Sequence, residues 1–193
     1  IPKFHMDAAR LVNALFDEEP FRSRRSDFNV WGLDLPSSES GVSRPRAMEF
    51  RRSPLSAEYN IFDSERYLLT YDNRALRDAA SAAPYEFLEI VVNEEQYGGG
   101  GIFNFQATVA ADTGFSAYVF VHEFGHHFAG LADEYYTSDV AYETGSAYHP
   151  EPWEPNVTAL HDPANLKWRD LVSADTPLPT PWDKNEFESA SSA

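Results

Sequence analysis

The 193-residue chain contains no cysteine, which excludes a disulfide framework and a thiolate metal site. It is also poor in basic residues, with 15 Lys and Arg against 31 Asp and Glu and a formal net charge of −16. A surface of that sign repels nucleic acid and anionic membrane, so neither is an expected partner. No apolar run approaches the roughly 18 residues of a membrane-spanning helix.

What the chain does contain is enough apolar material for a folded domain. Apolar residues make up 42% and aromatic residues 15%, which supports one core of good size. We expect an N-terminal helix and connector over residues 1–26, a main domain over residues 27–175, and a tail rich in proline, acid and serine over residues 176–193. Because the chain begins at Ile1 without methionine, we expect it to be processed or trimmed.

Apolar spacing predicts an amphipathic helix over residues 7–16 and a second from Asp72 or Asn73 to about Ala83. Alternation and residue type predict strands at residues 27–35, 47–50, 67–70, 87–92 and 102–108. Strand, helix and strand in succession favour a crossover connection and a partly parallel sheet. The pattern therefore predicts an α+β fold with a mixed, twisted sheet and a backing helix.

Residues 121–136, VHEFGHHFAGLADEYY, carry the clearest chemical signal. His122 and His126 stand four positions apart, so on a helix both imidazoles face one side and can bind one metal ion. Catalytic zinc usually takes three protein ligands and one water, and Glu123 is the natural general base for that water. His127 points about 100° away from His126, so we expect a packing or cleft-wall residue there.

A third ligand has to come from beyond this apolar helix. Gly130 suits the left-handed position that ends helices and turns the chain. Asp133 is then well placed to return to the metal, and Glu134 is the alternative; either carboxylate can instead lie behind the ligands or on the surface. Tyr135 or Tyr136 is a candidate for holding the oxyanion or orienting Asp133, although packing is the commoner role.

A glycine run precedes the motif, and its residues are Tyr97, Gly98, Gly99, Gly100 and Gly101. A phosphate cradle is excluded because the lysine and hydroxyl residue of a P-loop are missing. Two predictions remain: a flexible turn, or a bare strand edge along which an extended substrate pairs its backbone. In the second case these five residues bind substrate.

The string HEFGHHFAGLADEYY, with YGGGG upstream and NVTALHDPANLKW downstream, resembles the IgA peptidase family, or igalysins, of metzincin-like zinc endopeptidases. The likeness runs from about Phe28 to the end of the chain. It implies a zincin-type domain, Zn²⁺ on His122, His126 and Asp133, and Glu123 as catalytic base. It also implies a bacterial peptidase that is secreted or bound to the cell surface.

Two features depart from the metzincin pattern. Gly130 and Asp133 stand four and seven positions after His126 instead of three and six. The methionine that metzincins place under the metal is also missing downstream, since Met6 and Met48 both precede the motif. We therefore expect the natural chain to continue into a segment that supplies this methionine.

The sequence thus predicts a zinc-dependent endopeptidase in which a zinc-bound water attacks a peptide bond of an extracellular protein. The alternative function is a non-catalytic, zincin-shaped module that recognises a host or matrix protein. Glu123 argues against that alternative, because a structural zinc site has no need of this carboxylate. The oligomeric state is not indicated.

Overall fold

The computed structural model describes residues 1–134, 150–181, 183 and 185. These residues fall into two units, Ile1–Leu131 and residues 132–134 together with those from 150 on. The first unit contains the α-helices and strands, in the order α1 (Pro2–Asp17), α2 (Asn73–Ala80), β1 (Glu89–Val92), β2 (Gly99–Ile102), β3 (Gln106–Ala110) and α3 (Ser116–Ala129). The second unit has the 3₁₀ turns η4 (Pro163–Asn165) and η5 (Arg169–Leu171).

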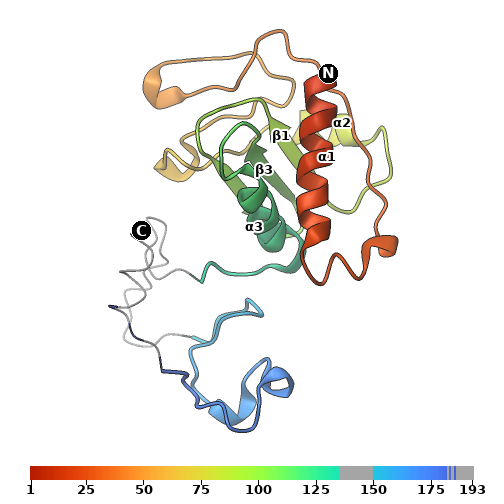
Figure 1. Ribbon diagram of the computed structural model, residues 1–193. Helices are drawn as coiled ribbons and strands as arrows, with labels where there is room; N and C mark the ends of the chain where they lie inside the picture. The colour runs from red at the N-terminus through yellow and green to blue at the C-terminus, as the bar shows by residue number, and fades with distance from the viewer. Residues whose placement is uncertain (135–149, 182, 184, 186–193) are drawn as a thin grey trace. The chain divides into compact units, whose positions relative to one another are not determined.

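The sheet has the strand order β1-β3-β2 (Figure 1). Strand β1 runs parallel to β3, with Glu89 opposite Ala107, and β2 runs antiparallel to β3, with Gly99 opposite Val109. The predicted mixed sheet in an α+β fold is therefore confirmed. The parallel pair β1–β3 is joined through β2 and its turns.

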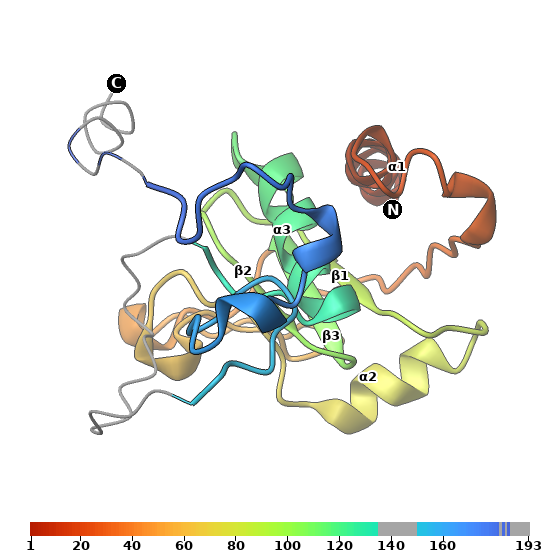
Figure 2. The same ribbon diagram turned by 90° about the horizontal axis from the view of Figure 1, so that it is seen from below.

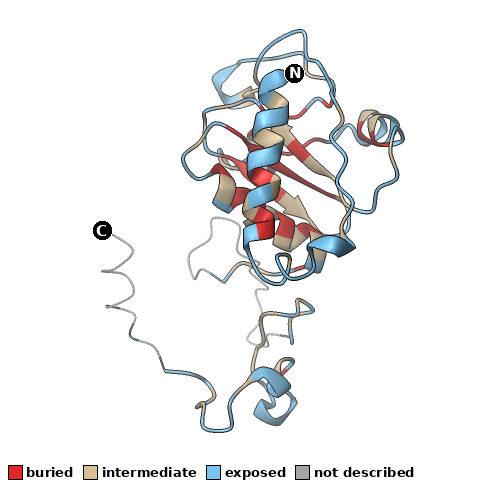
Figure 3. Ribbon diagram, turned by 45° about the vertical axis from the view of Figure 1, so that its right-hand side comes forward, coloured by how far each residue is buried: buried red, intermediate tan, exposed pale blue. Residues whose placement is uncertain are grey.

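One face of the sheet is covered by α3, and α1 packs on α3 in turn (Figure 2). Their apolar side chains form a core cluster with the sheet: Leu11, Leu15, Val109, Val119, Phe120 and Phe124. Figure 3 shows the resulting pattern on α1, whose outward face is exposed and whose buried residues, Leu11, Leu15 and Phe16, lie in its second half. A second cluster lies on the opposite face of the sheet and includes Tyr59, Leu68, Leu76, Ile90 and Val92.

Several predicted elements are confirmed by the structure. Helix α2 begins after Asp72, whose carboxylate accepts a hydrogen bond from the Ala75 amide at 3.0 Å. The predicted strand at residues 87–92 corresponds to β1, and the N-terminal helix extends over Pro2–Asp17. Capping chemistry and apolar periodicity are local signals, which is why these elements could be read from sequence.

Four strand predictions were wrong or too simple. Residues 27–35 form no strand, and Val30 and Trp31 are exposed, because alternation alone does not supply a neighbouring strand to pair with. Residues 47–50 contain the end of a 3₁₀ turn and one bridge, between Arg44 and Glu49. Residues 67–70 make only isolated bridges, and a turn at residues 103–105 separates β2 from β3.

Among the described residues, the longest helix is too short and too polar to cross a bilayer.

Candidate metal centre

Helix α3 carries the motif and ends where the sequence predicts. Gly130 adopts the left-handed conformation, with φ 63° and ψ 34°, and its amide donates to the His126 carbonyl oxygen at 3.0 Å. This is the αL type of helix ending, in which a residue without a Cβ satisfies a carbonyl that the helix leaves open. The chain then turns back so that Leu131 lies beside the last turn of α3.

His122, Glu123 and His126 are gathered at one point on α3. Their potential ligand atoms all lie within 4.8 Å of one another, and the Nε2 atoms of the two histidines are 3.0 Å apart. Zinc binds imidazole nitrogen at about 2.0–2.1 Å, so one ion can contact both Nε2 atoms across that gap. Two nitrogens and a neighbouring carboxylate are donors that zinc accepts, and the donor set therefore fits the predicted metal.

The His126 ring is oriented by a backbone group that sequence reasoning did not identify. Its Nδ1 atom is hydrogen-bonded to the carbonyl oxygen of Leu131. Because a carbonyl can only accept, Nδ1 carries the proton, and the Nε2 lone pair is left to face His122. The tautomer needed for metal binding is thus set by the turn at Gly130. The ring of Tyr118 stacks on His122, with centroids 5.8 Å apart.

His127 faces the sheet instead of the metal ligands, as predicted, and is fully buried. Its Nε2 accepts from the Leu88 amide at 3.0 Å, so its Nδ1 donates to the Ile102 carbonyl oxygen, also at 3.0 Å. Burial lowers the pKa of His127, which favours this neutral form. His127 therefore joins α3 to the start of β1 and to the end of β2.

The glycine run is a strand, so the prediction of a flexible turn was wrong. Strand β2 passes so close to α3 that side chains do not fit between them. A Cβ on Gly101 would lie 2.4 Å from the Glu123 carbonyl oxygen, and one on Gly99 would lie 2.6 Å from Val119 Cγ1. The glycines thus let β2 approach the helix that carries the ligands.

The outer edge of β2 is partly occupied. At Gly99 the amide donates to Arg66 O at 3.1 Å, and the carbonyl accepts from Leu68 N at 3.0 Å. The backbone of this residue is therefore bonded within the chain. Binding of substrate by residues 97–101 stays a prediction.

Glu89 is a further acid close to this region. It lies on β1, and both carboxylate oxygens are buried without a hydrogen-bond partner among the residues that the structure describes. Burial raises the pKa of Glu89 well above its ordinary value, and the charge of Glu123 adds to the shift. The protonated form of Glu89 is therefore favoured more than in an ordinary glutamate, and Glu89 lies near enough to the proposed base to sense its charge. No sequence signal marked it, because burial of a strand residue depends on what packs over it.

A family model described as IgA Peptidase M64 matches residues 1–193. The chain belongs to this family. Membership in the IgA Peptidase M64 family makes the chain a peptidase, and it confirms the resemblance seen in the sequence. No curated protein matches the chain.

In this M64 family member, the segment with Asp133 belongs to the second unit. The Asn156 side chain holds that segment: it accepts from the Ala132 amide and donates to the Ala132 carbonyl, both at 2.8 Å, and donates to Glu134 Oε1 at 2.9 Å. Asp133 as third ligand stays a prediction, and Tyr135 and Tyr136 lie outside the described residues.

The loop that carries Asn156 is organised by Lys167. Its ammonium group donates to the carbonyl oxygens of Pro152, Glu154 and Val157, the last two at 2.7 and 2.8 Å. The three N–H donors of the ammonium group match the three carbonyl acceptors, so Lys167 links three points of this loop. Asn156 and Lys167 both come from the downstream string on which the family resemblance rests, and their roles required the fold to be seen.

Proposed function

We propose that the chain is a zinc-dependent endopeptidase that cleaves extracellular proteins or peptides. The observation that carries the proposal is the pair of His122 and His126 Nε2 atoms 3.0 Å apart with Glu123 beside them. Family membership supplies the peptidase activity, and the donor set supports zinc as the metal. A zincin-type fold and a secreted or cell-surface location belong to the same proposal and rest on the sequence resemblance.

In this proposal the two histidines hold the metal and Glu123 handles the proton. When bound, zinc lowers the pKa of a water molecule to roughly 7 and polarises the peptide carbonyl. Glu123 takes the proton from the attacking water and delivers it to the departing amine. The carbonyl of Leu131 keeps the proton of His126 on Nδ1, so the Nε2 lone pair is available throughout.

Asp133 is proposed as the third ligand. Glu134, the alternative, is engaged by the Asn156 amide at 2.9 Å, which favours a supporting role for that carboxylate. The bidentate contact between Asn156 and the backbone of Ala132 restrains the residue immediately before Asp133. A ligand held in this way loses less conformational freedom on binding metal.

The test is the substitution Glu123→Gln in the full chain. We expect zinc content, measured by mass spectrometry of the metal, to stay near one ion per chain. We expect the rate of peptide cleavage to fall by about 10²–10⁴-fold, because removal of a general base costs about that factor. Cleavage at the parent rate would refute the role of Glu123.

Two controls sharpen this experiment. His126→Ala should lose both zinc and activity, whereas Asp133→Ala should lower zinc affinity more than Glu134→Ala does. Stoichiometric zinc in the parent chain without any chelator-sensitive cleavage would instead favour a non-catalytic binding module. A larger loss of zinc affinity in Glu134→Ala than in Asp133→Ala would show that Glu134, and not Asp133, is the third ligand.

A further inference from the structure

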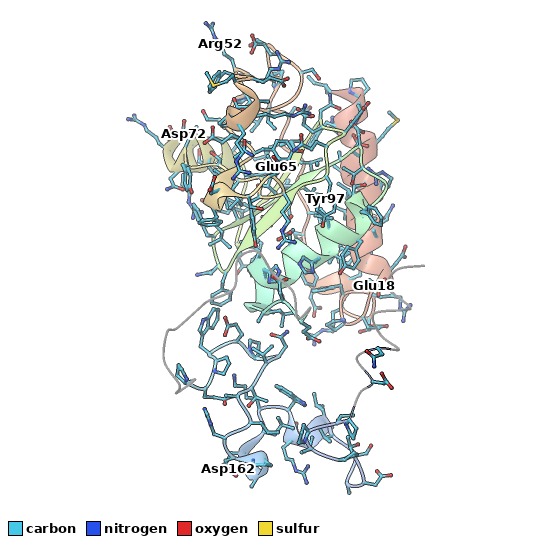
Figure 4. All side chains as sticks on the ribbon, turned by 90° about the vertical axis from the view of Figure 1, so that its left-hand side faces the viewer. Glu18, Arg52, Glu65, Asp72, Tyr97 and Asp162 are labelled. Atoms are coloured by element: carbon cyan, nitrogen blue, oxygen red, sulfur yellow. The ribbon has the colours of Figure 1, made fainter. Side chains whose placement is uncertain are left out.

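A hollow of about 480 Å³ opens in the first unit beside the start of β2. Its lining is rich in guanidinium and phenol groups, contributed by Arg44, Arg46, Arg66, Tyr59 and Tyr97. Glu65 also lines the hollow, and Figure 4 labels it together with Tyr97. A site lined by arginine is unusual in a chain with a net charge of −16.

One residue that lines the hollow, Tyr97, lies close along the chain to the candidate metal centre. Tyr97 stands two residues before Gly99, and a Cβ on Gly99 would lie 3.1 Å from Glu123 Oε1. Two residues of extended strand span about 7 Å. On its other side Tyr97 meets Phe115, at the N-terminal end of α3, with ring centroids 6.4 Å apart. A peptide held at Glu123 therefore reaches the hollow within a few residues.

The arginines differ in how firmly they are held. Arg44 forms an ion pair at 2.5 Å with Glu94, which is poorly exposed, so Arg44 is a fixed part of the lining of the hollow. Arg46 is paired with Asp63 at 2.5 Å and with Glu65 at 3.8 Å, and these two carboxylates are 94% and 77% exposed. Exposed pairs of this kind contribute about 0–1 kcal/mol, so a carboxylate from a ligand can replace them. Arg66 is also engaged within the chain, with its guanidinium over the ring of Tyr67 and 5.5 Å from the ring centroid.

We propose that this hollow is a specificity site that binds a carboxylate of the peptide substrate a few residues from the cleaved bond. Guanidinium groups bind carboxylates with paired hydrogen bonds, and the exposed ring of Tyr97 packs against the aliphatic stem of a bound side chain. The carboxylate comes from an Asp or Glu side chain or from the C-terminus of a peptide. This inference rests on the proposed peptidase function.

The experiment uses the zinc-loaded full chain. A peptide library is digested, and the best substrate is resynthesised with each Asp or Glu replaced by its amide, and separately with an amidated C-terminus. We expect one acidic position within about four residues of the cleaved bond, and at least a tenfold fall in kcat/KM when that carboxylate becomes an amide. A fall caused by C-terminal amidation instead would identify the C-terminus as the source of the carboxylate.

Arg66→Gln is the matching variant of the enzyme. It should lower kcat/KM about tenfold on the acidic peptide. It should leave kcat/KM on the amide peptide unchanged, because that peptide has no carboxylate to pair with Arg66. Arg46→Gln should act in the same direction. Arg74→Gln is the control, since Arg74 is an exposed arginine on α2 that does not line the hollow.

Two results would overturn the inference: equal kcat/KM for acidic and amide peptides, or an equal loss on both peptides in Arg66→Gln. Either result leaves the peptidase assignment intact. Complete absence of chelator-sensitive cleavage by the parent chain would overturn the proposed function itself, so the two failures are distinguishable. Melting temperatures of the variants show whether they are folded.

Discussion

At the scale of single residues, the clustering of His122 and His126 on one helix could be predicted and the groups that support them could not. The positions of His122 and His126 follow from helical spacing, which is a local property of sequence. The carbonyl of Leu131 acts on His126 only because Gly130 reverses the chain, and Glu89 is buried only because the sheet and helices close over it. Interactions of that kind depend on tertiary packing, so no motif contains them.

Glu89 gives a prediction about pH. Its pKa is raised in the folded protein and ordinary in the unfolded chain, so above about pH 4.5 the folded state binds more protons. The free energy of unfolding therefore falls as pH rises toward the folded pKa. Glu89→Gln removes this proton uptake. We expect the variant to gain stability relative to the parent with rising pH, by up to about 1.4 kcal/mol per pH unit.

Urea unfolding of both proteins between pH 5 and pH 8 measures this difference. Glu86→Gln serves as control, because Glu86 is exposed in the segment just before β1. A difference between Glu89→Gln and the parent that stays constant with pH would show that Glu89 is not held protonated.

At the scale of elements, the sequence predicted helices more accurately than strands. Helix α3, its end at Gly130 and the capped helix α2 all carry their signals within a few residues. A strand depends on a partner, and residues 27–35 have the alternation of a strand without forming one. The glycine run was harder still, because its composition fits a turn while its role is close packing against α3.

That packing gives a prediction about Gly101. In Gly101→Ala the new methyl group would meet the Glu123 carbonyl oxygen at 2.4 Å and His126 Cβ at 3.0 Å, so β2 and α3 must move apart. We expect the free energy of unfolding to fall by about 1–3 kcal/mol, with weaker zinc binding because His126 shifts with the helix.

Denaturant unfolding and a zinc competition assay measure the two effects. Gly114→Ala is the matched control, since a Cβ there meets nothing within 4 Å. Equal stability of the two variants would show that β2 and α3 do not need their close approach.

At the scale of the whole molecule, the family was predictable and the division into two units was not. The M64 family model matches residues 1–193, and the strings that carry the resemblance lie in both units. The boundary falls at Leu131, two residues after the last residue of α3, where no linker composition marks it. Leu11 and Leu15 of α1 lie in one core cluster with α3, and the expected boundary at residue 26 stays a prediction.

Metal removal tests the molecule as a whole. An ion that binds only the folded state stabilises it by about 2.7 kcal/mol when its free concentration is 100 times Kd. For a chain of this size that corresponds to a rise in Tm of roughly 5–10 °C. We expect EDTA to lower the Tm of the zinc-loaded protein by this amount, as measured by scanning calorimetry.

The same scan on His126→Ala should show no response to EDTA, because the variant lacks one of the two paired imidazoles. An undiminished response in His126→Ala would mean that the stabilising zinc is bound elsewhere in the chain.

The two hydrogen bonds of His127 have one more consequence. Successive residues on a helix are turned by about 100°, so the direction of His126 is fixed once that of His127 is fixed. By bonding Leu88 just before β1 and Ile102 at the end of β2, His127 prevents α3 from rotating about its own axis. The direction of the two candidate ligands, His122 and His126, is therefore set from the opposite side of the helix, by a residue that is not one of them.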